Sequence, residues 1–304
     1  MAPAGRPAGA MERERGRAYI WPRNFRRGNG SIAQRTAAAL ALTLPKIQEK
    51  VRLHSRIVTA ILIRDMRTRF GRTQFTYLVA IGWPLSHVSI MVIAFTFANR
   101  LIPFGTDSVV FITTGALPYV LCLYPARTMA LMTTHTGTTL QFPIVHPLHL
   151  ILARMLLEGL SAFFVALVFV SALWCLGIEI MPRDLPAALL AVYASVFFGL
   201  SIGLLGMVLR AVLKMPGYLI MVLTMIIMYF SSGVYMNVMP TSEMMRTLLS
   251  FNPIYQLVSW MRSAYFETHA AVPLDKAYVL FLSILLLFVG FLGERAFRGK
   301  FLTS

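Results

Sequence analysis

Six long apolar segments constrain this sequence more than any other feature, because each is long enough to cross a membrane. A transmembrane α-helix needs about 20 predominantly apolar residues. The segments cover residues 77–98, 109–131, about 153–176, 187–209, about 216–234 and 277–294. Charged residues make up 13% of the 304-residue chain, against about 25% in soluble domains. The sequence therefore predicts an all-α polytopic membrane protein with six transmembrane helices.

The positive charge of the chain is concentrated before the first span. Residues 1–76 hold 16 of the 28 lysines and arginines. We expect residues 1–35, which are rich in Arg, Gly, Ala and Pro, to form a disordered basic extension. Residues 36–76 are then a cytoplasmic region built on an amphipathic helix. Beside a membrane, such a flank favours anionic lipid rather than nucleic acid as its partner.

The segment from 51 to 77 has the periodicity of a helix that lies in the membrane interface. Its apolar residues recur at helical spacing, and several of its basic residues fall on the opposite face. The apolar positions are Leu53, Ile57, Val58, Ile61, Leu62 and Met66, and the polar positions are His54, Arg56, Arg64, Arg67 and Arg69. Gly71 allows a bend into the first span.

The basic N-terminal flank sets the predicted orientation, because Lys- and Arg-rich segments stay on the cytoplasmic side. With six spans, both termini are cytoplasmic, and the tail at 298–304 is also basic. The membrane domain then covers 77–297, with cytoplasmic loops at 132–152 and 210–215 and outer connections at 99–108, 177–186 and 235–276.

The first cytoplasmic loop leads into the stretch QFPIVHPLHLILARMLLEG, residues 141–159. Pro143 and Pro147 restrict the backbone and favour the first turn of a helix. Because this helix continues into the third span, it is suited to pass force from a soluble partner into the membrane. Arg154 and Glu158 have the i,i+4 spacing of an ion pair. The two histidines of HPLH lack an evident third ligand, so we predict no metal site.

The segment 235–275 is too interrupted by prolines to be a full span, although it is moderately apolar and aromatic. Short interfacial or re-entrant helices fit it better, since irregular backbone survives at membrane depth where protein or a water-filled cavity surrounds it. We therefore predict a short outer hairpin before the last span.

Arg127, near the inner end of the second span, has two interpretations. It either snorkels to the cytoplasmic interface or lines the inner mouth of a path for an anionic substrate. The aromatic residues near span ends and in the hairpin also have two interpretations. They form either an interfacial belt or ring faces along which sugars slide.

Several classes of protein are excluded or disfavoured by what the sequence lacks. GERAFRGKF (293–301) fails the phosphate-binding loop pattern, because five residues separate its glycines and Phe follows the Lys. The chain has 12 acidic residues, and almost none lies mid-span, as proton-coupled transport would require. A membrane glycosyl or phosphosugar transferase needs carboxylates for a metal and diphosphate, but loops 132–152 and 210–215 contain no Asp or Glu. We therefore expect a transporter subunit, not an enzyme, whose energy comes from another polypeptide.

Three stretches of the chain resemble the type-2 ABC exporter permeases. They are RDMRTRFGRTQFTYLVAIGWPLSHV (64–88), FPIVHPLHLILARMLLE (142–158) and FNPIYQLVSWMRSAYF (251–266). Within that class the chain is most similar to the inner-membrane permeases of bacterial capsular polysaccharide export, over about residues 50–300. Permeases for O-antigen or teichoic acid share the layout, and exporters of drugs or lipids share the architecture, so these cargoes stay open.

The resemblance implies a complex in the bacterial inner membrane. Two copies of this chain pair with two copies of a separate ATPase subunit, which binds ATP and Mg²⁺, while this chain itself holds no cofactor. Lipid-linked polysaccharide enters from the cytoplasmic side and passes between the two permeases. A periplasmic polysaccharide co-polymerase and an outer-membrane channel carry it onward.

The resemblance and the residue patterns together give two sets of candidate site residues. The candidates for ATPase coupling are Gln141, Phe142, Pro143, Ile144, Val145, His146, Pro147, Leu148, His149, Arg154 and Glu158. The candidates for the substrate path are Arg64, Arg67, Arg69, Phe70, Trp83, Tyr119, Tyr124, Arg127, Tyr229, Tyr235, Phe251, Tyr255 and Trp260.

Overall fold

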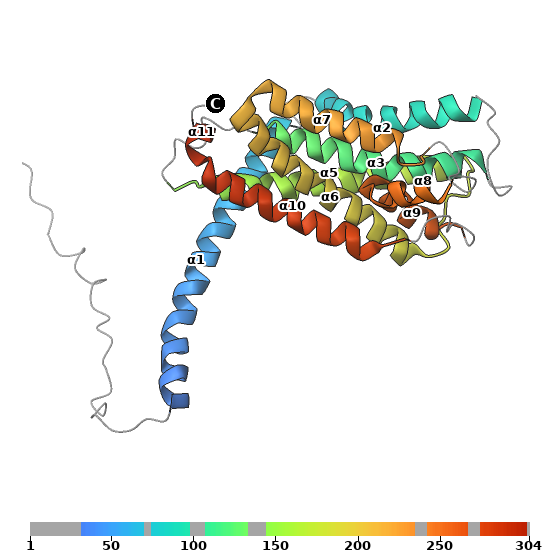
Figure 1. Cartoon of the computed structure of the whole chain (residues 1–304). Helices are drawn as coiled ribbons and strands as arrows, with labels where there is room; N and C mark the ends of the chain where they lie inside the picture. The colour runs from blue at the N-terminus through green and yellow to red at the C-terminus, as the bar shows by residue number, and fades with distance from the viewer. Residues whose placement is uncertain are drawn as a thin grey trace, which may run out of the picture. The chain divides into compact units, whose positions relative to one another are not determined.

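A computed structural model describes residues 32–69, 74–97, 107–132, 144–234, 242–266 and 274–302 (Figure 1). These residues form helices joined by short turns, and no strand occurs among them. The chain divides after Arg52 into two compact units, residues 1–52 and residues 53–304. All contacts discussed below lie within the second unit.

The described helices follow one another along the chain. Their bounds are α1 (Ile32–Arg69), α2 (Gln74–Phe97), α3 (Ser108–Ala130), α5 (Pro147–Cys175), α6 (Leu185–Leu213), α7 (Met215–Phe230), α8 (Glu243–Ser250), α9 (Pro253–Ser263), α10 (Lys276–Ala296) and α11 (Arg298–Leu302). Helix α1 begins at Ile32, four residues before the predicted interface region.

Four of these helices are long and apolar enough to cross a membrane: α3, α5, α6 and α10. Two shorter apolar helices, residues 81–97 of α2 and α7, accompany them. Each of the six lies where the sequence predicts a span. The largest differences are at α5, which begins at Pro147 instead of 153, at α6, which ends at Leu213 instead of 209, and at α7, which ends at Phe230 instead of 234.

Helices α3 and α6 form the centre of the second unit, where α3 is buried on nearly all sides. Small residues of α6, in the stretch GLSIG (199–203), allow these two helices to approach closely. A Cβ on Gly203 would lie 2.7 Å from the Cα of Ala126, and one on Gly199 would clash with the backbone of Cys122. The α3–α6 contact is therefore fixed by backbone proximity as well as by apolar burial.

Aspartates cap the first turns of three of the long helices. Asp107 accepts a hydrogen bond from the Val109 amide at the start of α3, and Asp184 accepts one from the Ala187 amide at the start of α6. Asp275 does the same for α10 through the Tyr278 amide. Asn, Asp, Ser and Thr favour this position because their side-chain oxygens satisfy amides that the helix leaves unpaired. These three polar turns mark one end of the bundle.

The predicted outer hairpin contains two short helices, α8 and α9, which lie at one end of the long helices, whereas α11 lies at the other (Figure 1). Helix α9 is buried against α3 and α6 over nearly its whole length, while α8 has no buried residue. The hairpin thus adds one core helix and one surface helix to the bundle.

Candidate functional site

The candidate coupling segment begins just before α5. Pro147 is the first residue of the helix, as the sequence predicts, and His146 precedes it in an extended conformation. Ile144, His146 and Leu148 are exposed, whereas His149 is 3% exposed. No separate short helix occurs at 144–146, so the described helical part of this segment is the first turn of α5 itself. Val145 is half-buried, and Gln141, Phe142 and Pro143 lie outside the described residues.

A directed chain of hydrogen bonds joins this first turn to α1. The His146 backbone amide donates to Nδ1 of His149 at 3.1 Å, so this nitrogen is unprotonated. The proton of the neutral ring is then on Nε2, which lies 2.6 Å from Nδ1 of His54. The sequence analysis missed this role of His54, because 95 residues separate the two histidines and no local pattern links them.

Arg154 and Glu158 form the ion pair that their spacing predicts, with 3.0 Å between Arg154 Nε and Glu158 Oε1. The Glu158 side chain is 2% exposed and that of Arg154 is 20% exposed. Both belong to α5, two turns beyond the candidate coupling segment, so their pair lies within one helix instead of joining two.

Five candidate or neighbouring residues from three helices meet along α3. The Tyr124 hydroxyl lies 3.4 Å from the Trp83 carbonyl oxygen and 3.4 Å from His87 Nδ1, both on α2. One turn away, Arg127 Nε donates to the Tyr218 hydroxyl of α7 at 3.3 Å. We call these five residues the α2–α3–α7 cluster. Its members are partly exposed, and the Trp83 side chain is 65% exposed.

Tyr119 and Tyr229 stack face to face behind this cluster, with ring centroids 3.8 Å apart. They are 3% and 6% exposed, and the His87 ring meets Tyr119 edge-on at 6.4 Å. Because each ring covers the face of the other, this pair joins α3 to α7 and offers no free ring face in the monomer.

In the outer hairpin, Tyr255 and Trp260 are also buried, at 5% and 4% exposure, whereas Phe251 is 67% exposed. Tyr235 lies outside the described residues. The structure therefore separates the aromatic candidates into packed rings, which belong to the core, and exposed rings, of which Trp83 and Phe251 are the clearest.

Asn252 and Arg262 hold α9 against the end of α7. The Asn252 side chain caps α9 and donates to the Met228 carbonyl at 2.7 Å. Arg262 donates to the carbonyls of Gly233 at 3.0 Å and Val234 at 2.8 Å. Its guanidinium lies 4.0 Å from the centre of the Phe111 ring.

Burial lowers the pKa of Arg262 to about 9, which leaves it charged at neutral pH. The sequence analysis did not single out this residue, because an arginine at the end of an aromatic segment also fits an interfacial position.

The basic candidates of α1 differ in their surroundings. Arg64 pairs with Asp65 at 2.7 Å, while Arg67 is exposed. The side chain of Arg69 and the whole of Phe70 lie outside the described residues. Among the residues that the structure describes, no group of three or more His, Cys, Asp or Glu side chains is arranged to hold a metal ion.

Comparisons with known proteins show which proteins this chain resembles in sequence. No protein-family model matches the sequence. The chain is 25% identical over 250 residues to the polysialic acid transport protein KpsM of Escherichia coli, a match that covers 81% of this chain and 95% of that protein. This chain is a distant homologue of capsule polysaccharide export inner-membrane proteins.

Two further capsule export proteins support the same relationship. The capsule polysaccharide export inner-membrane protein CtrC of Neisseria meningitidis is 25% identical over 243 residues, which is 80% of this chain and 91% of CtrC. BexB of Haemophilus influenzae, which has the same descriptive name, is 26% identical over 160 residues, or 52% of this chain and 60% of BexB. The similarity to the first two export proteins extends over nearly their whole length.

Proposed function

We propose that this chain is the membrane-spanning permease subunit of an ATP-driven exporter that moves lipid-linked capsular polysaccharide across the bacterial inner membrane. The observation that carries this proposal is the similarity to capsule polysaccharide export inner-membrane proteins, which covers about four fifths of this chain. The apolar helices agree with a membrane location.

The proposed topology has six spans, formed by α2, α3, α5, α6, α7 and α10, with both termini in the cytoplasm. Successive helices then alternate in direction, and α8 and α9 lie on the outer side. Three observations support this arrangement: the hydrophobicity of the six helices, the aspartate caps at one end of the bundle, and the basic N-terminal flank.

ATP hydrolysis belongs, in this proposal, to a separate subunit that contacts the exposed first turn of α5. The support is the exposure of Ile144 and Leu148 at 64% and 44%, which leaves apolar side chains available to a partner. Two such ATPase subunits, each with ATP and Mg²⁺, and a second permease complete the transporter. A periplasmic co-polymerase and an outer-membrane channel receive the polymer.

The α2–α3–α7 cluster is the best-supported candidate for contact with the polymer. It combines an arginine, partly exposed tyrosines and an exposed tryptophan, which suit an acidic sugar chain through charge and ring stacking. Arg127→Ala is expected to reduce export while protein level and ATPase association stay unchanged. Unchanged surface polymer in this variant would instead assign Arg127 to interfacial snorkelling.

The proposed function is tested by deletion of the gene in its host, followed by localisation of the polysaccharide. We expect polymer of normal composition to accumulate in the cytoplasm, because synthesis is intact and export is lost. Loss of all polymer would favour an enzyme or a synthesis scaffold. Unchanged surface polymer would exclude capsule as the cargo and direct attention to O-antigen, teichoic acid, drugs or lipids.

A further inference from the structure

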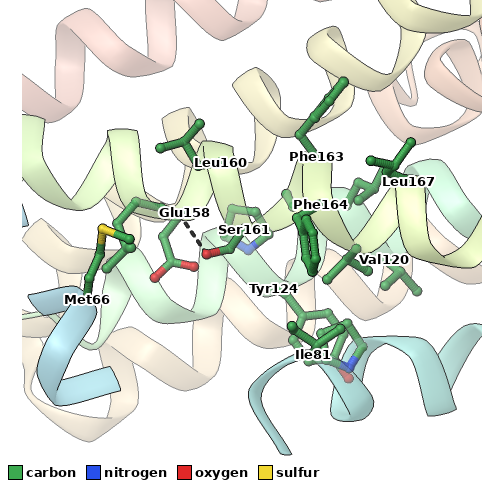
Figure 2. Close-up of a pocket in the computed structure, with 16 residues that line it drawn as sticks. Met66, Ile81, Val120, Tyr124, Glu158, Leu160, Ser161, Phe163, Phe164 and Leu167 are labelled. Atoms are coloured by element: carbon green, nitrogen blue, oxygen red, sulfur yellow. Dashed lines mark hydrogen bonds between the residues drawn. The ribbon is translucent and has the colours of Figure 1, made fainter. Parts of the chain in front are cut away.

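An apolar groove of about 580 Å³ lies among α1, α2, α3 and α5, outside the α2–α3–α7 cluster except for Tyr124, which borders both. Met66 and Glu158 lie at one end of the groove, and Val120 and Leu167 lie toward the other (Figure 2). Apart from Glu158, Ser161 and the tyrosine hydroxyl, the side chains that line it are apolar. The Ser161 hydroxyl already bonds to the Leu157 carbonyl within its own helix at 2.8 Å.

The groove is open toward the lipid side of the bundle. Leu160, Phe164 and Leu167 line it and are 61%, 48% and 54% exposed, although they belong to one of the most apolar helices of the chain. Its floor is formed by buried residues of α3 and α5, including Leu121 and Leu157. An apolar opening in a membrane-spanning helix faces acyl chains, not water.

The length of the groove matches one leaflet of a bilayer. The lining residues of α5 run from Leu157 to Leu167, a rise of about 15 Å at 1.5 Å per residue. The hydrocarbon core is about 30 Å thick, so one leaflet contributes about half of it. Since α5 begins at the proposed cytoplasmic face, and the Arg154–Glu158 pair marks the start of the groove, the leaflet concerned is the cytoplasmic one.

The helix that lines the cytoplasmic end of the groove, α1, is basic around Met66, with Arg64 two residues before it and Arg67 one residue after it. Arg154 pairs with Glu158, and Arg64 pairs with Asp65. The exposed Arg67 follows Met66, the residue of α1 that lines this end. A phosphate placed there would meet a basic side chain at headgroup level.

From these observations, we propose that the groove holds one acyl chain of an anionic phospholipid from the cytoplasmic leaflet, with the headgroup phosphate beside Arg67. The chain would complete the packing between α2 and α5, where protein side chains leave the space open. Of the α2–α3–α7 cluster, which is the proposed polymer contact, this site shares only Tyr124.

The test uses the full chain in phosphatidylcholine vesicles that contain phosphatidylglycerol with a photoreactive acyl chain. We expect saturable labelling of residues 157–167 and 120–125. Unlabelled phosphatidylglycerol should compete about five-fold better than phosphatidylcholine, the preference that one basic side chain gives an anionic headgroup. Labelling that rises linearly with probe and marks Leu152 and Leu156 as strongly as Phe164 would overturn the proposal in favour of annular lipid.

Three variants sharpen the result. Ser161→Trp should fill the groove and abolish saturable labelling, whereas Leu156→Trp, at an exposed position of the same helix outside the groove, should leave it intact. Arg67→Gln should retain labelling but lose the preference for phosphatidylglycerol. If Ser161→Trp fails to fold, the competition between the two phospholipids in the unaltered protein still tests whether the groove binds an anionic lipid.

Displacement of the probe by polymer-bearing lipid from the host, but not by phosphatidylglycerol, would assign the groove to the cargo and overturn the proposal.

Discussion

The two ends of the helix bundle are held together in different ways. At the outer end, side chains bond from one element to another: Asn252 and Arg262 of the α9 segment both reach carbonyls at the end of α7. At the inner end, the described ion pairs Arg154–Glu158 and Glu294–Arg298 each lie within one turn of a single chain segment. The bond between α3 and α7 at this end, from Arg127 to Tyr218, is longer, at 3.3 Å, and only partly buried. A bond between elements fixes their relative position, whereas a pair four residues apart does not.

This difference separates a fixed end from an end that is able to rearrange. The buried α9 and its polar contacts hold the outer ends of α3, α6 and α7 together. At the inner end, the bond between His54 and His149 joins the first turn of α5 to α1 among the described residues, together with apolar packing. In the proposed transporter, force from an ATPase at the first turn of α5 would therefore move the inner ends of the helices about an outer end that stays fixed.

The largest loss of stability is expected from Arg154→Met, because it leaves the buried Glu158 carboxylate without its 3.0 Å partner. Removal of one member of a buried ion pair costs about 3–5 kcal/mol, whereas replacement of both by apolar residues is often neutral. Thermal unfolding in detergent should therefore show that Arg154→Met with Glu158→Met recovers most of the loss. A double variant as unstable as the single one would mean that the pair joins α5 to its neighbours, and the contrast between the two ends would weaken.

The next largest effect is expected at the outer end, from Arg262→Leu. This change leaves the carbonyls of Gly233 and Val234 without their donor. The cost is roughly 1–3 kcal/mol for the buried Val234 acceptor, and it is smaller for the half-buried Gly233 carbonyl. Arg295→Leu, the same replacement at an exposed position of α10, provides the control in the same unfolding experiment. Equal stability of the two variants would show that the outer end does not depend on this contact.

A smaller effect is expected from Asn252→Ala, which removes both the cap of α9 and the bond to Met228. Loss of a helix cap costs about 0.5–2 kcal/mol, and we expect the upper part of that range. Ser242→Ala removes the cap of the exposed helix α8, which has no such second bond to α7, and should cost less. If Asn252→Ala and Ser242→Ala lower the free energy of unfolding equally, only the helix cap contributes to stability, and the bond from Asn252 to the end of α7 does not.

The smallest effect on stability, but a clear one on transport, is expected from His54→Ala. A hydrogen bond contributes about 0.5–1.5 kcal/mol net, and the apolar contacts of Ile57, Val58 and Ile61 remain. Export of polymer should fall at unchanged protein level, because α1 no longer follows the first turn of α5. His54→Asn, which keeps a side-chain acceptor, should restore part of the lost export. Full export by His54→Ala would show that the bond has no part in coupling.

The sequence allowed the apolar helices to be located because hydrophobicity over about 20 residues is a local property. The same holds for Pro147 at the start of α5 and for the pair of Arg154 and Glu158. The contact of His54 with His149 depends on how distant segments pack, and no periodicity encodes it. Burial of Trp260 likewise follows from the position of α9 against α3 and α6, which an aromatic segment next to a span does not reveal.

The length of α7 has a consequence for the membrane around it. Its 16 residues rise about 24 Å, which is about 6 Å less than the usual hydrocarbon thickness. Such hydrophobic mismatch is relieved by thinning of the bilayer beside the short helix or by polar groups that reach inward. Asn252 and Arg262 lie at the proposed outer end of α7 and supply polar groups there. A polar polymer that leaves along α7 would therefore cross a thinner hydrocarbon barrier than along any of the other proposed spans.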